Sequence, residues 1–190
     1  MHSAFVFMWL YRLLLCILGG MIFITGGTGI LGMRMVYDLL SMGKKIRAMR
    51  RPQSDMELFH KVMAFYGDSD TLEKVNEIEW VEGDVMNPLL LEEALQGCSH
   101  CIHAAAIVSF HSKDEDEMRQ INVEGTANMV NACLSIPNIR LLHVSSVAAL
   151  GRTGEEGLIN EDQVWKDSPY NTAYAVSKYQ SEMEVWRGVE

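Results

Sequence analysis

Short apolar runs alternate along the chain with longer stretches in which apolar positions recur at helical spacing. The apolar runs predict strands at 21–25, 45–49, 78–82, 100–104 and 140–145. The longer stretches predict helices at 29–41, 55–65, 89–95, 115–134 and 172–187, with a shorter helix at 71–76. Strands that alternate with helices in this way are typical of a parallel sheet covered by helices. The pattern therefore predicts an α/β fold, a doubly wound parallel sheet with helices on both faces.

The chain of 190 residues is long enough for one domain with a hydrophobic core, and the pattern assigns residues 21–190 to it. Residues 5–18 are apolar except for Arg12. This run is shorter than a membrane-spanning helix needs, and the arginine interrupts it, so attachment to a membrane is disfavoured. Because Met21 opens the first strand, we interpret residues 1–20 as an apolar leader produced by an upstream start codon. The alternatives are a membrane-associated leader and an extra packed helix.

Charge and cysteine content narrow the class of protein. The formal net charge of −9 argues against a nucleic-acid partner, because phosphate binding needs clustered Lys and Arg. The four cysteines are too few and too scattered for a disulfide framework, and reduced thiols suit a cytoplasmic protein. Cys98 and Cys101 form a CxxC pair followed by His103, but no second ligand pair accompanies them. We therefore expect small core residues here and no metal site.

A glycine-rich loop, GGTGILG at 26–32, follows the first strand and opens the first helix. Its glycines lack the Cβ atoms that would block a pyrophosphate or hold the helix away from the sheet. The N-terminus of the helix also offers N–H groups and a positive dipole to phosphates. This order of strand, loop and helix predicts a Rossmann-like, dinucleotide-binding domain. The cofactor-binding residues expected in the loop are Gly26, Thr28, Gly29, Ile30, Leu31 and Gly32.

The end of the second strand favours NADP as the cofactor and leaves NAD as the alternative. An acidic residue at this place would accept hydrogen bonds from the ribose hydroxyls of NAD. Residues 45–52 read KIRAMRRP, and no carboxylate follows until Asp55. We expect Arg50 and Arg51 to bind the 2′-phosphate of NADP. The alternative is that both arginines lie in a solvated loop.

Tyr174 and Lys178 are four residues apart, so on a helix they share one face. A free phenol is a poor acid or base at neutral pH because its pKa is about 10, and a nearby cation favours its ionised form. Tyr174 is therefore expected to exchange a proton with a substrate hydroxyl or carbonyl, and Lys178 to bind the nicotinamide ribose. Ser145 and Ser146 end the fifth strand, where a hydroxyl can donate to the substrate oxygen. The alternative role of this serine pair is to cap the strand end.

Together these motifs resemble the extended short-chain dehydrogenase/reductase family over residues 21–187, and within it the branch of dihydroflavonol-reductase-like and hydroxysteroid-dehydrogenase-like enzymes. The matching motifs are TGGTGILG at 25–32, GDV at 83–85, HAAA at 103–106, NVEGT at 122–126, SS at 145–146, and Tyr174 with Lys178. The resemblance implies that Ser146 matches the catalytic hydroxyl better than Ser145. It assigns adenine contacts to Asp84 and Val85, the lining of the cofactor to Ala104, Ala105 and Ala106, and the bracing of a helix near the site to Asn122.

The resemblance implies an NAD(P)-dependent oxidoreductase that moves a hydride between the nicotinamide and a small-molecule hydroxyl or carbonyl substrate. In that enzyme Tyr174 transfers the proton, Lys178 favours the phenolate, and Ser146 orients the substrate oxygen. Two alternatives stay open. The first is an NAD-dependent nucleotide-sugar epimerase or dehydratase of the same fold, and the second is a non-catalytic dinucleotide-binding module.

Members of the family continue past this helix with another strand and a substrate-binding region, whereas the sequence ends at Glu190. We therefore expect the isolated chain to bind cofactor weakly and to turn over little. The helix bearing Tyr174 often forms a dimer interface in the family, so the resemblance allows a homodimer through it. Trp165, Tyr179 and Trp186 would either face that partner or pack within the chain.

Overall fold

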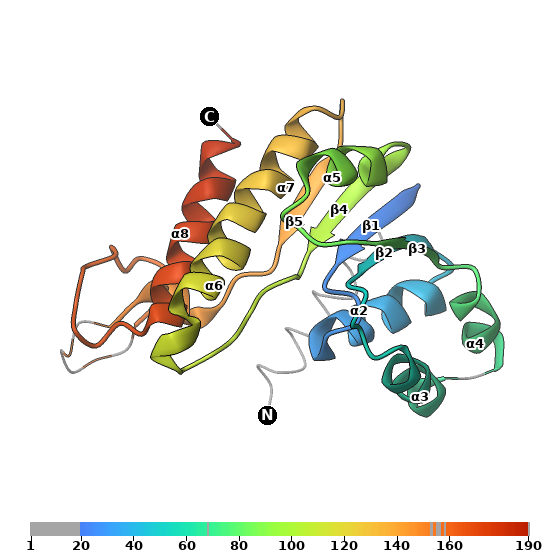
Figure 1. Cartoon of the computed structure of the whole chain (residues 1–190), viewed down its shortest axis with the longest axis horizontal. Helices are drawn as coiled ribbons and strands as arrows, with labels where there is room; N and C mark the ends of the chain where they lie inside the picture. Colours follow the sequence, from blue (N-terminus) through green and yellow to red (C-terminus); the bar gives the residue numbers. More distant parts are fainter. Residues whose placement is uncertain (1–19, 68, 153, 155–156, 158, 190) are drawn as a thin grey trace.

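The computed structural model describes residues 20–67, 69–152, 154, 157 and 159–189, and it confirms the doubly wound α/β sheet (Figure 1). All strand pairs that the structure describes are parallel, and the strand order is β3-β2-β1-β4-β5. The strands are β1 (Met21–Thr25), β2 (Lys45–Arg50), β3 (Glu79–Glu82), β4 (Cys98–His103) and β5 (Arg140–His143).

The helices fall where the sequence predicts them. They are α2 (Ile30–Ser41), α3 (Met56–Tyr66), α4 (Ser69–Val75), α5 (Pro88–Leu95), α6 (Glu115–Arg119), α7 (Gly125–Leu134) and α8 (Ala173–Arg187). Polar residues begin several of them, because a side-chain oxygen satisfies an amide that has no partner in the first turn. Asp55 accepts from Leu58 N in α3, and Thr172 accepts from Ala175 N in α8.

Two details differ from the sequence prediction. The helix predicted at 115–134 contains a π-helical turn, η2 (Gln120–Glu124), between α6 and α7. Turns of this kind occur often at functional sites. The strand predicted at 140–145 ends at His143, because the chain then enters a short 3-10 turn, η3 (Val147–Leu150), which Ser146 caps. A second 3-10 turn, η1 (Ser112–Asp114), precedes α6.

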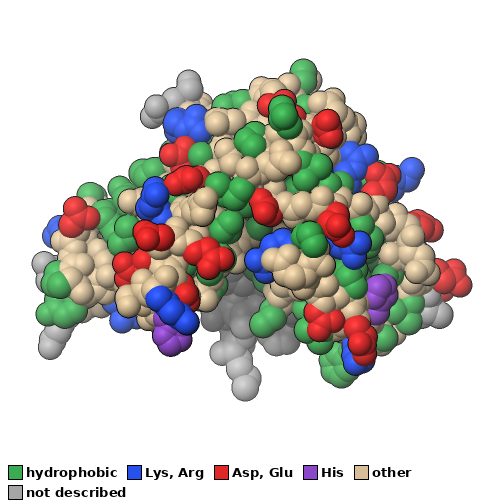
Figure 2. Space-filling view, in the orientation of Figure 1, with side chains coloured by type: hydrophobic (Ala, Val, Ile, Leu, Met, Phe, Trp, Pro, Cys, Tyr) green, Lys and Arg blue, Asp and Glu red, His purple; other side chains and the backbone are tan. Residues whose placement is uncertain are grey.

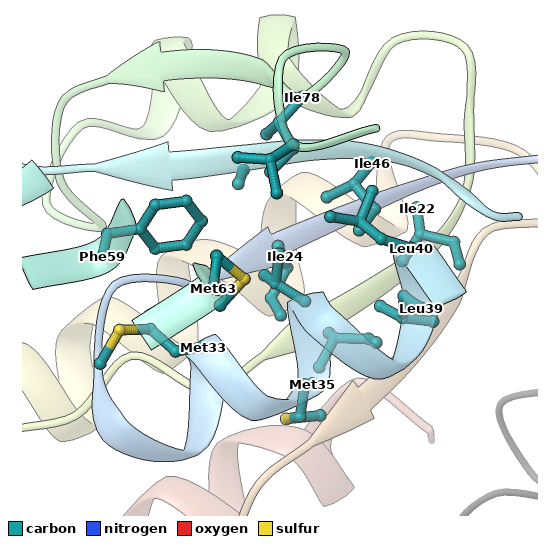
Figure 3. Packing of buried hydrophobic residues seen from close by; sticks show 14 residues of the cluster. Ile22, Ile24, Met33, Met35, Leu39, Leu40, Ile46, Phe59, Met63 and Ile78 are labelled. Atoms are coloured by element: carbon teal, nitrogen blue, oxygen red, sulfur yellow. The ribbon is translucent and has the colours of Figure 1, made fainter. Parts of the chain in front are cut away.

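Two apolar clusters fix the helices on opposite faces of the sheet. On one face α2, α3 and α4 pack on β1 and β2, and Figure 3 shows side chains of this cluster, including Phe59 and Met63 from α3 against Ile24. On the other face α5 and α7 pack around Phe23 and Cys101. Helix α8 packs beside α7 on that second face (Figure 1). Side chains that alternate along each strand thus enter different cores, and the loops at the strand ends are held from both sides.

No helix in the described ranges is both long and apolar enough to cross a lipid bilayer. The interpretation of residues 1–20 as a leader concerns, apart from Gly20, residues outside the described ones. On the face drawn in Figure 2, acidic side chains lie among Lys and Arg side chains.

Candidate active site

The glycine turn between β1 and α2 lies against the end of β4. Gly26 has a φ of +71°, and a Cβ on it would lie 2.7 Å from backbone atoms of Ala104 and Ala105. A Cβ on Gly32 would collide with the carbonyl oxygen of Gly26. Both positions require glycine, because the atoms that a side chain would meet belong to the backbone and cannot rotate away. The turn therefore keeps a shallow backbone surface that a cofactor can approach.

The first turn of α2 presents its amide end at this glycine turn. Gly29 is the N-cap, and its N–H donates to the Gly26 carbonyl at 3.0 Å. No side chain among the described residues caps the helix. Ile30 and Leu31 expose 91% and 50% of their surface, so nothing large in the described chain covers the turn. Amide groups in such a position bind phosphate, and the helix dipole favours an anion. The turn fits the pyrophosphate of a dinucleotide.

Arg50, the last residue of β2, is committed to the neighbouring strand. Its Nη2 forms an ion pair with Glu82 Oε2 at 3.1 Å. Its Nε is buried and has no hydrogen-bond partner within the described residues. Arg50 therefore reaches a 2′-phosphate only in competition with a carboxylate.

Arg51 is exposed and belongs to a small polar cluster that the sequence did not reveal. Ser54 Oγ accepts hydrogen bonds from Arg51 N at 3.0 Å and from Thr28 Oγ1 at 3.3 Å. The hydroxyl hydrogen of Ser54 stays available to an anion. Asp55 is occupied as the N-cap of α3. Ser54 thus joins the glycine turn to the loop that follows Arg51. Its only signal in the sequence is its position in the loop after the second strand.

Asp84 and Val85 follow β3 and are fixed by local contacts. Asp84 Oδ1 accepts from Met86 N at 2.7 Å. Val85 is buried against Gly125, where a Cβ would collide with its side chain, and its carbonyl accepts from Asn128 Nδ2 at 3.1 Å. The predicted contact with adenine therefore has a rigid support from α7, and it stays a prediction.

The segment 104–106 begins beside the last residue of β1. Ala104 N donates to the Thr25 carbonyl and Ala105 N to Thr25 Oγ1, each at 3.2 Å, while Ala106 is exposed. These bonds fix the start of the loop after β4 against the glycine turn. Small side chains at this place leave the turn uncovered, which is what their predicted role in lining a cofactor requires.

Asn122 lies in the π-helical turn and holds the loop after β4 to α8. Its side chain is buried, and its Oδ1 accepts from Ile107 N at 2.7 Å. Its Nδ2 donates to Ile107 O at 2.9 Å and to Ser177 Oγ at 3.0 Å. Ser177 precedes Lys178 directly, so Asn122 fixes the segment of α8 that carries the lysine.

Lys178 is buried at the carboxyl end of β5. Only 2% of its surface is exposed, and its Nζ donates to Val144 O at 2.9 Å and lies 3.4 Å from His143 Nε2. Burial lowers the pKa of Lys178 to about 8, although nearby Glu182 opposes the shift. Burial also lowers the pKa of His143 to about 4, with a further contribution from the charge of Lys178. At neutral pH the lysine is therefore still largely an ammonium group beside a neutral histidine.

Tyr174 lies one helical turn before Lys178 on α8, and its half-buried ring contacts Phe110 with ring centroids 6.4 Å apart. Ser145 Oγ donates to Glu182 Oε1 on the same helix. Ser146 Oγ accepts from Ala148 N at 3.2 Å, so it caps the 3-10 turn η3, whereas the alternative interpretation of the serine pair was a cap at the strand end. A hydroxyl that accepts one bond keeps its own hydrogen as a donor, so capping leaves Ser146 able to serve a substrate oxygen.

The strand order arranges these groups in sequence along one edge of the sheet (Figure 1). The carboxyl ends of parallel strands lie at the same edge, where doubly wound sheets bind ligands. Along this edge Arg50 and Arg51 at the end of β2 lie on one side of the central glycine turn, and the serines after β5 lie on the other. A dinucleotide laid across the turn would extend from the loop after β2 on one side to Ser146 and Lys178 on the other.

Cys98, Cys101 and His103 have protein partners, as small core residues do. Cys98 Sγ donates to Ala94 O at 3.6 Å, and Cys101 Sγ donates to Met129 Sδ at 3.4 Å. His103 bonds two threonines, Thr25 and Thr126. The described residues contain no group of three His, Cys, Asp or Glu side chains that could hold a metal ion.

Residues 23–188 match the 3-beta hydroxysteroid dehydrogenase/isomerase family. The chain belongs to this family. Membership confirms the resemblance to extended short-chain dehydrogenases/reductases, and it covers most of the chain, including every motif from the glycine turn to the tyrosine helix.

Curated relatives are reductases and related proteins. A putative dihydroflavonol 4-reductase from Synechocystis sp. is 35% identical over 164 residues, which cover 86% of this chain and 43% of the relative. Sterol demethylase protein B from Methylococcus capsulatus is 32% identical over 173 residues, covering 88% of this chain and 48% of the relative. The chain thus spans slightly less than half the length of these two relatives.

Solved structures share the fold. The Bordetella bronchiseptica enzyme WbmG, solved with NAD and UDP, is 27% identical with a TM-score of 0.67, and the match covers 88% of this chain and 49% of WbmG. Vestitone reductase from alfalfa has a TM-score of 0.69 at 23% identity, with coverage of 89% of this chain and 52% of that enzyme. At this lower identity the likeness concerns the fold alone.

Gly26 and Gly43 form a matched pair for testing the close approach of the turn. Both have a φ near +70°, but a Cβ on Gly43 would meet nothing within 4 Å. We expect Gly43→Ala to lower the free energy of unfolding by only about 1 kcal/mol, the cost of a left-handed alanine. Gly26→Ala should cost clearly more and raise the Kd for NADPH, because its Cβ also meets the backbone of β4. Urea unfolding and NADPH fluorescence measure the two effects, and equal behaviour of both variants would disprove the role of the contact.

The burial of Lys178 predicts a rise of stability at alkaline pH. Its pKa is lowered to about 8 in the folded chain, so between pH 8 and 10.5 the unfolded chain binds more protons than the folded one. The free energy of unfolding should therefore increase by about 2 kcal/mol between pH 7 and 9.5. Urea unfolding of Lys178→Met should lack this increase, whereas the exposed control Lys113→Met should keep it. An identical pH slope in both variants would contradict the assignment.

Proposed function

We propose that the chain is the cofactor-binding part of an NAD(P)-dependent oxidoreductase acting on a hydroxyl or carbonyl group of a small molecule. The observation that carries the proposal is the buried Lys178 ammonium at the carboxyl end of β5, one helical turn after Tyr174. Burial of a lysine costs free energy, and a purely structural position would be satisfied by an apolar residue. The family of the chain and its reductase relatives support the same activity.

The cofactor supplies or accepts the hydride when it is bound, and the residues of the chain handle the proton. In the direction of reduction, Tyr174 donates its hydroxyl proton to the carbonyl oxygen of the substrate as negative charge develops there. Lys178 stabilises the phenolate that remains, since its positive charge lies on the same helix face. Ser146 donates a hydrogen bond to the same substrate oxygen. In the direction of oxidation the proton returns from the substrate hydroxyl to Tyr174.

The cofactor would be held by the glycine turn, the exposed amide end of α2 and the loop at 104–106. We favour NADP over NAD, because Arg51 is exposed and its backbone N–H bonds the Ser54 hydroxyl, while Asp55 Oδ1 caps α3. A guanidinium and a hydroxyl bind a phosphate through charge-assisted hydrogen bonds.

A nucleotide-sugar epimerase or dehydratase is the second candidate. The observation that favours it is the likeness to WbmG, which was solved with NAD and UDP. The two candidates differ in how they hold the cofactor. An epimerase uses NAD transiently and retains it through purification, whereas a reductase exchanges NADP with solution. Denaturing the purified whole protein and identifying any released dinucleotide by chromatography would separate them, because retained NAD favours the epimerase.

The proposal also includes a cytoplasmic location and a homodimer through α8. The free, buried cysteines suit a reducing compartment. Trp186 exposes 61% of its surface on α8 and is available to a partner. Trp165 and Tyr179 instead stack on each other, with ring centroids 4.2 Å apart, and pack within the chain. Light scattering that reports a monomer at all concentrations would remove the dimer from the proposal.

The proton-transfer role of Tyr174 is tested by Tyr174→Phe in the complete protein. The substitution removes only the hydroxyl, so turnover should fall at least about a thousandfold, in line with the upper range for a general acid. The Kd for NADPH should stay within about twofold, because in the proposed reaction the Tyr174 hydroxyl bonds the substrate oxygen and not the cofactor. Steady-state kinetics and fluorescence titration measure the two quantities. Retained turnover would assign the proton transfer to another group.

Cofactor preference is tested by Arg51→Ala and Arg50→Ala. Loss of a charge-assisted bond should raise the Kd for NADPH about tenfold or more in Arg51→Ala, with little change for NADH. Arg50→Ala should have the smaller effect, because its guanidinium is paired with Glu82. The exposed Arg152→Ala serves as the control for net charge. Equal affinities for both cofactors, unchanged by either substitution, would remove NADP from the proposal.

A further inference from the structure

His103 lies at the centre of a buried chain of hydrogen bonds between the glycine turn and the π-helical turn. Its Nδ1 lies 2.7 Å from Thr25 Oγ1, and its Nε2 lies 3.1 Å from Thr126 Oγ1. Thr25, His103 and Thr126 are each at most 1% exposed. None of these three residues has a role in the proposed chemistry, although buried polar groups cost free energy and are seldom placed without a function in packing or positioning.

The hydrogen-bonding partners determine which atom donates in each of these bonds. Thr126 Oγ1 donates its hydrogen to Asn122 O at 2.6 Å, so it can only accept from His103. His103 therefore carries its hydrogen on Nε2, and its Nδ1 accepts from the hydroxyl of Thr25. Thr25 Oγ1 in turn accepts from Ala105 N at 3.2 Å. Burial lowers the pKa of His103 to about 3, with smaller contributions from His143 and Lys178, so the ring stays neutral.

Both ends of the chain of bonds reach the candidate active site. Thr25 directly precedes Gly26, and its hydroxyl holds the loop after β4 through Ala105. At the other end, Asn122 donates to Ser177 Oγ, and Ser177 directly precedes Lys178. A single histidine ring thus lies between the turn that would hold the cofactor and the helix that carries the proton-transfer residues.

We propose that His103 is a positioning residue that couples the cofactor-binding turn to the catalytic helix through Thr25 and Thr126. This inference rests on the proposed function. The ring fixes the separation of the two threonines, because its nitrogens point in opposite directions and each has one compatible partner. Loss of the hydrogen bond between His103 and Thr126 should therefore displace the glycine turn and weaken cofactor binding, even though Thr126 has no predicted contact with the cofactor.

A double-mutant cycle on the whole protein tests this coupling, with NADPH and NADH as probes. Thr126→Val keeps the shape of the side chain and removes the acceptor of the His103 hydrogen. We expect it to raise the Kd for the preferred cofactor about three- to tenfold, the worth of roughly one hydrogen bond. In the background of His103→Leu, where Kd is already raised, Thr126→Val should change Kd by less than about twofold, since the coupling has been removed.

Conservative variants keep the test decisive if His103→Leu does not fold. In His103→Asn the amide oxygen can replace Nδ1 as acceptor for Thr25, but the side chain is too short for Thr126. Thr126→Val should then have no further effect on Kd. In His103→Gln the amide nitrogen can replace Nε2 as donor to Thr126, so the effect of Thr126→Val should persist. Met129→Ala, a buried position farther along α7, is the control that lowers stability without touching these bonds, and its Kd should stay unchanged.

The outcomes separate this inference from the proposed function. If the unsubstituted protein binds neither NADPH nor NADH, the proposed function itself is wrong. If it binds cofactor and Thr126→Val raises Kd equally with and without His103, the two residues act independently and the coupling is disproved. An unchanged Kd in Thr126→Val, or an equal rise in Met129→Ala, would likewise overturn the positioning role, since loss of stability alone would then explain the effects.

Discussion

The close backbone contact between the glycine turn and the end of β4 is the constraint on which the rest of the site depends. Gly26 can lie there only because it has no Cβ, and the atoms it faces are the backbone of Ala104 and Ala105. The contact draws the first turn of α2 toward the carboxyl edge of the sheet, where Ile30 and Leu31 are exposed. It also fixes the start of the loop that Asn122 later holds. A side chain at Gly26 would separate the two loops and displace the groups that follow from both.

Around this contact the chain buries polar groups and gives most of them specific partners. Thr25, His103, Asn122, Ser177 and Lys178 are all nearly inaccessible to solvent. Buried polar groups that are fully bonded permit one arrangement and penalise others, because each displaced bond leaves an unpaired donor or acceptor. This side of the candidate active site is therefore held in one arrangement by the chain itself, and rigid support of this kind is what the proposed proton-transfer pair would require. The burial of the Lys178 ammonium costs free energy, and its lowered pKa reflects that cost.

The sequence predicted much of this arrangement, and its omissions have a common physical cause. Strand and helix positions, the glycine turn and the Tyr174–Lys178 pair depend on spacing within one segment, which periodicity reports. The bond between Thr25 and His103 joins residues 78 positions apart, and it exists only because β1 and β4 are neighbours in a particular register. Local pattern carries no information about register between distant strands. The alternative for the serine pair was a cap at the strand end, but Ser146 caps the turn η3, which no pattern predicted. The π-helical turn at Asn122 likewise has no periodic signal.

Cofactor preference shows how structure changes the meaning of a sequence motif. In the sequence, Arg50 and Arg51 are adjacent and equally able to bind a 2′-phosphate. In the fold they differ, because Arg50 extends along the sheet to Glu82, whereas Arg51 lies in the loop whose Ser54 also binds Thr28 of the glycine turn. Arg51 thus lies in a loop that the Ser54 hydroxyl joins to the glycine turn, whereas Arg50 is paired with a carboxylate of the neighbouring strand. Under the proposed function, discrimination between the two cofactors would depend on the exposed Arg51, and the number of arginines would matter less than which carboxylates surround them.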